Sequence, residues 1–221
     1  MNSKHIMHVG YMKTGTSWLW HNLINHPDVS QTKIKEDSAL LKGETVTAYV
    51  DRYNQYGNIT LNFCPINAYI DQYLIEQLSQ QQQIIASITI RNPYEFIFSM
   101  LNSVPAFAKY SFKDYASVAV NQGLWYLDIA SNIKRWQQFF GEEFGIFFYE
   151  DLKEDAKMYY EKYLEFAGLA HHTPDVSSFN KTSYYKPEME ISDKNVICQL
   201  ERIIDNLERL LDKDLSNWRR A

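Results

Sequence analysis

The sequence is short of cysteine and of long apolar runs, and each shortage excludes a class of protein. Only two cysteines occur in its 221 residues. Cys64 and Cys198 lie far apart without metal-ligand spacing, so we interpret them as buried or incidental thiols in a reducing compartment. No apolar stretch approaches the roughly 18 residues that a membrane-spanning helix needs, and no signal peptide is visible. We therefore expect a cytoplasmic protein with no membrane span.

Basic residues are also in short supply. The chain has 22 lysines and arginines against 27 aspartates and glutamates, for a formal net charge of −5. Because no dense Lys/Arg stripe is present, the composition argues against nucleic-acid binding. A small anionic ligand is still possible, since its site needs only a few placed cations. Nothing in the sequence suggests a metal site, and we expect none.

The hydrophobic content of 45% is enough for one sizeable core, and the length favours a single domain over residues 1–221. Ile84–Ile90 ("IIASITI") is a nearly continuous β-branched run, as expected of a strand buried on both faces of a parallel sheet. The other predicted strands are His5–Gly10, Gln31–Lys35, Ile59–Phe63 and Phe144–Glu150. Helices are predicted over 16–26, 67–80, from 93 onward, in one or two pieces over 112–140, and over 155–167 and 192–211.

This alternation indicates an α/β fold in which helices flank one parallel sheet with right-handed crossovers. In such sheets ligands bind at the carboxyl ends of the strands. Three polar segments fall there, "GYMKTGTS", "KED" and "RNP". We expect the functional site at this edge of the sheet.

The first of these segments has the features of an anion site. A turn that ends at Gly15 leads directly into a helix, so its backbone N–H groups and the positive end of the helix dipole can face an anion. Thr16 and Ser17 place hydroxyls on the first helical turn, where they can donate to phosphate oxygens. Lys13 can reach a second charged group. The alternative is a plain helix N-cap by one of the loop's threonines beside a solvated lysine, because G-x-x-x-x-G alone is a weak signal.

"YMKTGTSW" resembles the 5′-phosphosulfate-binding loop of sulfotransferases that use 3′-phosphoadenosine 5′-phosphosulfate (PAPS). In that loop a lysine precedes Ser/Thr-Gly-Thr-Ser/Thr and often a tryptophan. The resemblance implies a P-loop-like sulfotransferase fold, and it implies that Lys13 meets the leaving phosphate and the bridging oxygen. It implies donor contacts by Lys13, Thr14, Gly15, Thr16, Ser17 and Trp18. For Trp18, filling the core is an equal alternative.

A second match comes from "RNPYEFIFS" (Arg91 to Ser99), which resembles the family's 3′-phosphate motif. Arginine would end a strand and serine would lie two turns into the following helix, so both could hold one phosphate from the same side. A surface ion pair for Arg91 and a neutral helix position for Ser99 are the alternatives. Lys181 and Thr182 lie in a late polar loop, where the family often closes over the nucleotide, and are further candidates for the 3′-phosphate.

Sulfuryl transfer also needs a base to take the acceptor's proton. Members that act on heparan sulfate use a glutamate in a Lys-Glu pair soon after the second strand. "KIKEDSALLKG" supplies Lys35 and Glu36 at that place, so we expect Glu36 to be the base and Lys35 to pair with it and touch the sulfonate. Asp37 replaces the proline of the fuller Lys-Glu-Pro-x-Phe-Phe pattern, and an exposed salt bridge is the alternative. His21 is the rival base, because members that act on small phenols and steroids use a histidine.

We therefore expect a sulfotransferase that moves a sulfuryl group from PAPS to a hydroxyl or amine and releases 3′-phosphoadenosine 5′-phosphate (PAP), with no metal. A P-loop kinase should show Gly-Lys-Ser/Thr and a strand-ending aspartate for Mg²⁺, whereas here the lysine precedes the glycine and Arg91 follows the strand. A non-catalytic nucleotide-binding protein is the second alternative. The acceptor, whether carbohydrate, lipid or small metabolite, and the oligomeric state are not encoded in any motif.

Overall fold

The structure, a computed structural model, describes residues 3–30, 32, 34–103, 110–121, 127–177 and 193–219. The chain forms two compact units. Unit 1 comprises residues 1–90 and 135–180, and unit 2 comprises residues 91–134 and 181–221. The expectation of a single domain stays a prediction.

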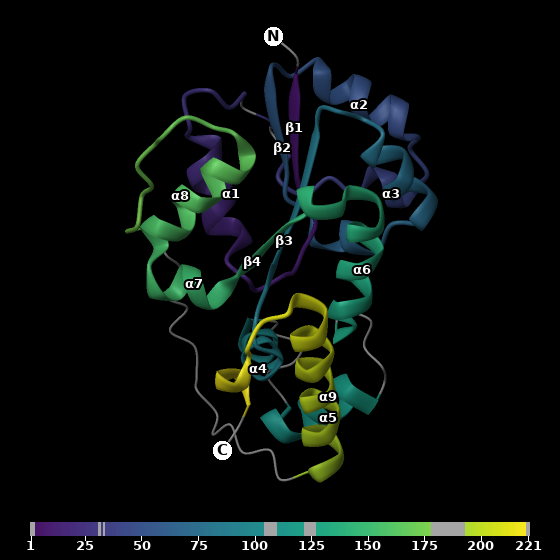
Figure 1. Ribbon diagram of the computed structural model, residues 1–221, viewed down its shortest axis with the longest axis vertical. Helices are drawn as coiled ribbons and strands as arrows, with labels where there is room; N and C mark the ends of the chain where they lie inside the picture. The colour runs from purple at the N-terminus through teal and green to yellow at the C-terminus, as the bar shows by residue number, and fades with distance from the viewer. Residues whose placement is uncertain are drawn as a thin grey trace. The chain divides into compact units, whose positions relative to one another are not determined.

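A four-stranded parallel sheet forms the centre of unit 1 (Figure 1). The strands lie in the order β2-β1-β3-β4. They are β1 (Lys4–His8), β2 (Ile59–Asn62), β3 (Ile84–Ile90) and β4 (Gly145–Phe148). β3 has a neighbour on each side, which explains why all but one of its residues are buried. The predicted α/β fold with a parallel sheet is confirmed.

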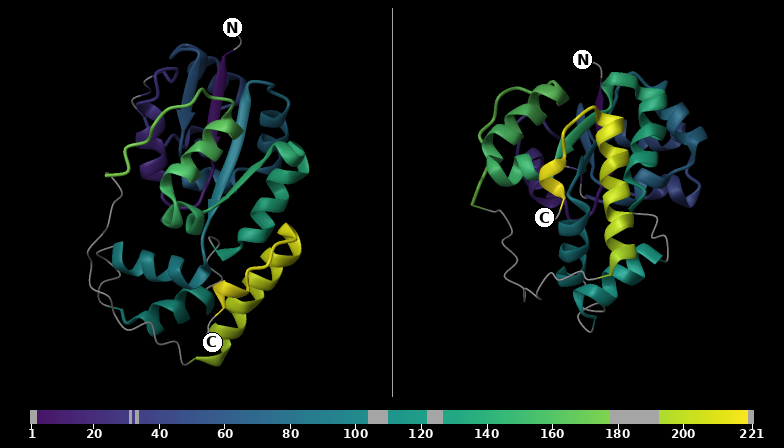
Figure 2. Two further views of the ribbon diagram at one scale, coloured as in Figure 1. Left: turned by 60° about the vertical axis from the view of Figure 1, so that its left-hand side comes forward. Right: turned by 60° about the horizontal axis from the view of Figure 1, so that its bottom comes forward.

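Helices cover both faces of this sheet (Figures 1 and 2). On one face lie α1 (Thr16–Ile24), α7 (Tyr149–Glu154) and α8 (Ala156–Ala167). On the other lie α2 (Val46–Asn54), α3 (Gln72–Ser79) and the second half of α6 (Ile129–Phe140). Short 3₁₀ turns occur at Ala39–Lys42, Pro65–Tyr69 and Gly141–Glu143.

Each face has its own apolar core. On the α1 side, Trp18, Leu19 and Leu23 are buried in one cluster with three tyrosines of α8. On the opposite side, Trp136 of α6 is fully buried, stacks on Phe144 at 5.7 Å between ring centroids, and donates its indole N–H to Ala68 O at 3.3 Å. Burying aromatic side chains of this size supplies much of the free energy of folding.

The predicted strand over Gln31–Lys35 is wrong, because its described residues 32, 34 and 35 form no strand. The segment runs beside β2 and bonds to it near both ends. Ser30 N–H donates to Ile59 O at 2.7 Å, and Phe63 N–H donates to Lys35 O at 2.8 Å. In a regular parallel ladder that starts with the first bond, Phe63 N–H would donate to Thr32 O, and here it donates to Lys35 O, three residues farther on. The two bonds therefore do not share one register and do not belong to one regular ladder.

Two further predicted elements differ from the structure. The helix expected over 67–80 is a 3₁₀ turn followed by α3, whose N-cap Asp71 accepts from Tyr73 N–H. The last strand ends at Phe148, so Glu150 lies inside α7, and the N-cap of α8 is Asp155. α2 was not predicted. The strand over Ile59–Phe63 and the helices that begin at Thr16 and Pro93 are confirmed.

Unit 2 is helical in the part that the structure describes. It contains α4 (Pro93–Ser103), α5 (Phe112–Asn121), the first half of α6, α9 (Lys194–Leu211) and a 3₁₀ turn at Ser216–Trp218. α9 buries four apolar residues at helical spacing, Val196, Leu200, Ile204 and Leu207. Near the C-terminus, Arg219 pairs with three carboxylates of α9, those of Glu201, Asp205 and Glu208.

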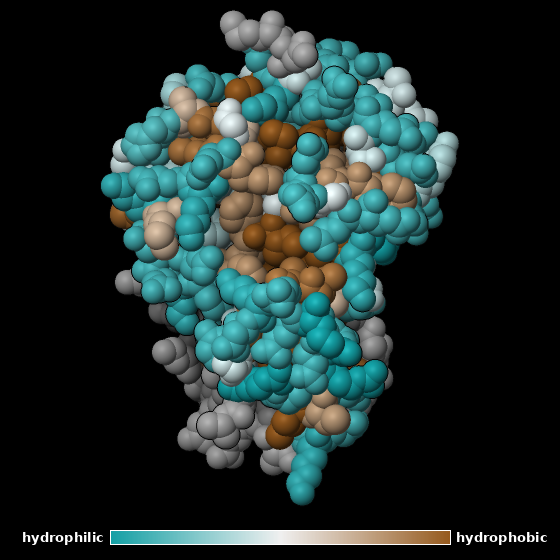
Figure 3. Space-filling model, viewed as in Figure 1, coloured by the Kyte–Doolittle hydropathy of each residue, from teal (hydrophilic) through white to brown (hydrophobic). Residues whose placement is uncertain are grey.

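Apolar residues reach the surface of unit 1 along β4. Among the described strands its only neighbour is β3, and Ile146, Phe147 and Phe148 are half-buried. Figure 3 shows apolar colour on this face of unit 1, where Figure 1 places β3 and β4 between α8 and α6. Among the described helices, none combines the length and the apolarity that crossing a membrane requires.

Candidate functional site

The segment after β1 runs along β3 before it turns. Tyr11 N–H donates to Thr89 O at 2.9 Å, and Thr89 N–H donates to Gly10 O at 3.0 Å. The buried Thr14 hydroxyl then donates to Tyr11 O at 2.6 Å and closes the turn from within. The predicted donor loop comprises residues 11–18. Its start is therefore fixed at the carboxyl ends of two adjacent strands, as expected for a ligand site in a parallel sheet.

The turn contains two residues with a left-handed backbone. Lys13 has φ 64° and Gly15 has φ 81°. A positive φ is uncommon for a residue other than glycine, and such residues gather at functional sites. Gly15 directly precedes α1, and no side chain caps that helix. The first N–H groups of α1, which have no carbonyl partner within the helix, therefore lie next to Lys13 in the chain and are suited to an anion.

Gly15 is also required by close packing. A Cβ at this position would lie 2.3 Å from Cδ2 of Leu152, far inside van der Waals contact. Leu152 is a buried residue of α7. The loop therefore rests on α7 at a point where only glycine fits, and Leu152 acquires a role in supporting the loop.

Lys35 joins the start of α1 to the predicted base. Its ammonium donates to Ser17 Oγ and to Glu36 Oε1, both at 2.9 Å. Ser17 is exposed on the first turn of α1, whereas Thr16 is buried. We call these three side chains the Ser17–Lys35–Glu36 row. It places a hydroxyl, an ammonium and a carboxylate in one hydrogen-bonded line beside the donor loop, with the Glu36 side chain 54% exposed.

Asp37, which follows this row, belongs to a buried polar network. Its carboxylate pairs with Arg52 at 2.7 Å, and it accepts from Tyr53 OH at 3.1 Å and from Ala39 N–H at 2.9 Å. Burial alone would raise the pKa of the Asp37 carboxyl, but the hydrogen bonds from Arg52 and the Ala39 N–H outweigh it and hold the pKa below its ordinary value. Asp37 is therefore a charged structural residue, with α2 supplying its counter-ion.

The histidines lie in different surroundings. His8 at the end of β1 stacks on Phe63 at 4.9 Å and bonds Ser87 Oγ through Nδ1 at 2.9 Å. His5 bonds Thr60 and Tyr49 through its two ring nitrogens. Burial lowers the pKa of both histidines to about 3, so both rings are neutral at pH 7. The rival base His21 is exposed on α1.

The predicted 3′-phosphate residues lie in unit 2. Arg91 donates to Glu95 Oε2 at 2.9 Å, an ion pair at i,i+4 spacing, and its side chain is 12% exposed. Ser99 lies within α4, as the sequence predicted, and is half-buried. A guanidinium carries five N–H donors in a planar fork, a geometry that suits phosphate oxygens as well as carboxylates.

Three other predicted donor residues are Trp18, Lys181 and Thr182. Trp18 packs with Tyr159 and Tyr160, is 4% exposed, and donates its indole N–H to Asp175 O at 3.1 Å. It fills the core, the second of the two roles weighed for it, and a contact with the donor stays a prediction. Lys181 and Thr182 lie outside the described residues.

Sequence reasoning missed the residues that hold the row in place. Asn62, the last residue of β2, and Asn67 both bond the backbone of Asp37. The available signal was weak: an asparagine is the last residue of the strand "ITLN". Its partner is 25 positions away in the sequence, so only the fold reveals the contact.

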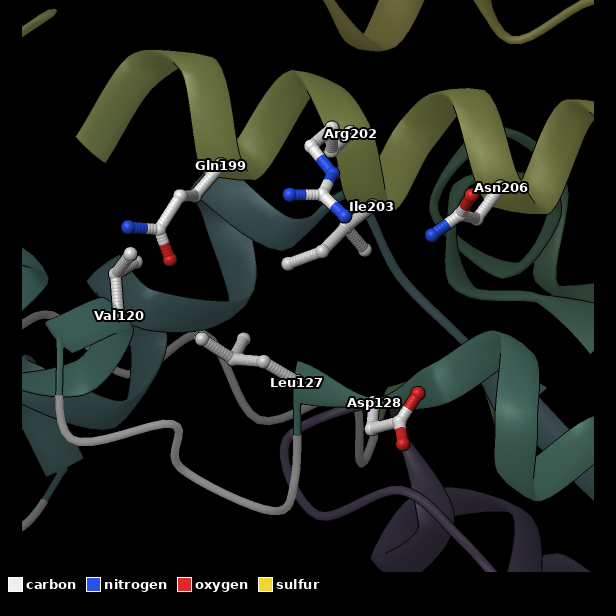
Figure 4. Close-up of a pocket in the computed structure, with 7 residues that line it drawn as sticks. All are labelled: Val120, Leu127, Asp128, Gln199, Arg202, Ile203 and Asn206. Atoms are coloured by element: carbon white, nitrogen blue, oxygen red, sulfur yellow. The ribbon is translucent and has the colours of Figure 1, made fainter. Parts of the chain in front are cut away.

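Within the described ranges, no group of three or more His, Cys, Asp or Glu side chains could hold a metal ion. Unit 2 contains a hollow of ≈ 240 Å³ whose lining includes none of the predicted site residues. In Figure 4, three polar side chains of α9 extend toward an apolar wall and Asp128. The lining residues are Val120, Leu127, Asp128, Gln199, Arg202, Ile203 and Asn206.

Comparisons with known proteins agree with this fold. A family model described as "Sulfotransferase domain" matches residues 3–195, a span that includes parts of both units. A sulfotransferase crystal structure from Alicyclobacillus acidocaldarius is 19% identical, with a TM-score of 0.69 and 100% of each chain covered. Mouse sulfotransferase SULT7A1 complexed with PAP is 16% identical, with a TM-score of 0.52 over 78% of this chain and 61% of the mouse chain. The fold is thus the P-loop-like sulfotransferase fold. No curated protein sequence matches this chain.

Proposed function

Because this chain belongs to the sulfotransferase domain family, we propose that it transfers a sulfuryl group from PAPS to a hydroxyl or amine of an acceptor. The observation that supports this most is the Ser17–Lys35–Glu36 row, which brings a carboxylate and an ammonium to the start of α1. An exposed ion pair contributes little to folding stability, so stability alone is a poor reason for this arrangement. PAP in the mouse structure supports PAPS as the donor, because PAP is what PAPS leaves after transfer.

The proposed reaction is an in-line displacement at sulfur. The acceptor oxygen or nitrogen forms a bond to sulfur while the bond from sulfur to the bridging oxygen breaks, and that electron pair stays on the phosphate of PAP. Glu36 takes the acceptor's proton. Lys13 and the N–H groups at the start of α1 stabilise the charge that grows on the bridging oxygen and the leaving phosphate. Lys35 contacts the sulfonate and keeps Glu36 oriented through the 2.9 Å bond.

The remaining donor contacts are assigned by resemblance. Arg91 and Ser99 are proposed to bind the 3′-phosphate, with Lys181 and Thr182 as further contacts. Thr14, Gly15, Thr16, Ser17 and Trp18 are proposed as contacts of the phosphosulfate loop. A metal is not part of the proposed reaction, since lysine and arginine can supply the positive charge that Mg²⁺ provides in kinases. A cytoplasmic location and a carbohydrate, lipid or small-metabolite acceptor stay predictions.

Two nucleotide conditions separate this function from the kinase alternative. The protein is incubated with PAPS and EDTA, or with ATP and Mg²⁺, and release of PAP or ADP is measured with phenols, sugars and amines as acceptors and water as the basal acceptor. We expect turnover of PAPS in EDTA. Turnover of ATP but not of PAPS would identify a kinase. Binding of PAP without turnover of either nucleotide would identify a non-catalytic protein.

Two substitutions test the assigned roles. Lys13→Ala and Glu36→Gln should each lower kcat by about 10²-fold or more, the scale of a positioned charge stabiliser or base. PAPS turnover is the measurement, and Lys42→Ala, on an exposed lysine after the row, is the control. If Glu36→Gln keeps the full rate, the base is elsewhere and His21→Gln is the next variant.

A further inference from the structure

The side chain of Asn62 bonds the backbone of Asp37 as a neighbouring strand would. Its Oδ1 accepts from Asp37 N–H at 3.1 Å, and its Nδ2 donates to Asp37 O at 2.9 Å. The second hydrogen on Nδ2 goes to Tyr49 OH at 2.7 Å. Asn62 is 1% exposed, so these bonds are not exchanged for bonds to water. The carboxamide of Asn62 therefore takes the place of a peptide group on a neighbouring strand, because it has one acceptor and one donor for the backbone of Asp37.

Two further bonds secure the same segment. Asn67, also 1% exposed, donates to Asp37 O at 3.0 Å, so this carbonyl oxygen has both of its lone pairs engaged. Phe63 N–H donates to Lys35 O at 2.8 Å. Glu36 is consequently the residue between two anchored neighbours, each tied to the end of β2.

β2 connects these anchors to the donor loop. Asn62 pairs with Met7 in the parallel ladder between β2 and β1, and β1 ends one residue later at His8. The residue that holds Asp37 and the strand that feeds the donor loop are thus adjacent in one rigid sheet. A fixed distance between the loop and Glu36 follows, because no flexible segment separates Asn62 from β1.

From these contacts we propose that Asn62 is a positioning residue for Glu36, acting through the backbone of Asp37, with Asn67 in a supporting role. The proposal rests on the proposed function, in which Glu36 is the base. Glu36 itself is exposed, and its one described side-chain bond is to the adjacent Lys35. Its backbone must therefore be fixed by its neighbours, and a displacement of about 1 Å can lower a rate by about 10²-fold.

The test is a double-mutant cycle on PAPS turnover. Asn62→Asp keeps the shape of the side chain but removes both donated hydrogens. We expect kcat to fall about 10- to 100-fold while KM for PAPS and the thermal shift with PAP stay unchanged. In a Glu36→Gln background, Asn62→Asp should cause no further loss, because it acts through that carboxylate. Thr60→Val is the matched control: Thr60 is also buried on β2 but bonds His5 instead of Asp37, so kcat should be kept.

A second variant tests the proposal if Asn62→Asp does not fold. Asn67→Ala removes one of the two bonds to Asp37 O and should lower kcat about 3- to 10-fold, again only when Glu36 is present. The proposal is overturned if either variant keeps the wild-type kcat, or if its effect multiplies with that of Glu36→Gln. Failure of the proposed function gives a different result: wild-type protein that releases no PAP from PAPS, or a fully active Glu36→Gln variant.

Discussion

At the scale of single residues, the buried histidines couple the stability of the fold to pH. His5 and His8 are fully enclosed, and burial lowers the pKa of each from 6.5 to about 3. In the unfolded chain the rings regain their ordinary pKa, so between pH 6.5 and 3 the unfolded state binds more protons than the folded state. The free energy of unfolding therefore falls as the pH falls through this window.

This coupling can be measured as a slope. Each histidine should contribute up to about 1.4 kcal/mol per pH unit below pH 6. Urea unfolding at pH 7, 6 and 5 gives the slope for the wild-type protein and for His8→Gln, which should show a smaller one. The slope is compared and not the free energy of unfolding at one pH, because loss of the bond to Ser87 changes that free energy at every pH. A substitution of the exposed His171 should leave the slope alone, and an unchanged slope in His8→Gln would contradict the prediction.

Motif reasoning reaches some residues of the candidate site and not others. Lys13, Lys35 and Glu36 were predicted because each stands at a fixed position in a short local pattern, and the structure does bring Lys35 and Glu36 to the start of α1. Asp37 looked like a departure from the family pattern. Its N–H, which proline would lack, is the group that Asn62 holds. Contacts between positions 25 apart leave no local pattern, so sequence reasoning could not find them.

At the scale of elements, the junction between the donor loop and α1 depends on Gly15. This residue needs both a positive φ and the empty space beside Leu152. Gly43 provides a comparison, because it has φ 93° but a Cβ at that position would meet nothing within 4 Å. The two positions separate the conformational cost of a side chain from the packing cost.

Gly15→Ala should abolish the thermal shift with PAP and lower PAPS turnover at least about 10²-fold, because the added methyl displaces the loop from α7. Gly43→Ala should keep the activity and lose about 1 kcal/mol of stability, the cost of left-handed backbone for alanine. Calorimetry with and without PAP measures both effects. Normal PAP binding by Gly15→Ala would show that the loop does not need its close packing against Leu152.

The elements that the sequence predicts best are those whose patterning is strongest. β3 was predicted residue for residue because its β-branched run is almost unbroken. The pattern over Gln31–Lys35 also predicted a strand, but the bonds Ser30 N–H to Ile59 O and Phe63 N–H to Lys35 O do not share one register against β2. α2 was missed because the segment around it matched no known motif. Its role appears only with the fold, where Arg52 of this helix pairs with Asp37.

At the scale of the whole molecule, the proposed donor binding would be linked to folding stability, because a ligand that binds only the folded state stabilises it. PAP at 100 times its Kd should stabilise the protein by about 2.7 kcal/mol, or roughly 5–10 °C for a chain of this size. ATP at the same concentration should give a much smaller shift. This comparison tests the donor without knowledge of the acceptor.

Arg91→Ala should reduce the shift with PAP at least by half, because it removes the proposed 3′-phosphate contact. Differential scanning fluorimetry over a range of PAP concentrations is the measurement. Arg202→Ala, on an exposed arginine of α9 in the same unit, is the control and should keep the full shift. An undiminished shift in Arg91→Ala would remove Arg91 from the proposed site.

The close packing of Gly15 against Leu152 also has a genetic consequence. Glycine and alanine codons differ at the second base alone, so one point mutation suffices to silence the protein in a living cell. The altered product bears both the cost of left-handed backbone for alanine and the clash with Leu152, so its abundance has to be matched to that of the original. At matched abundance, such an allele would separate the effects of the proposed sulfation from those of the protein's mere presence.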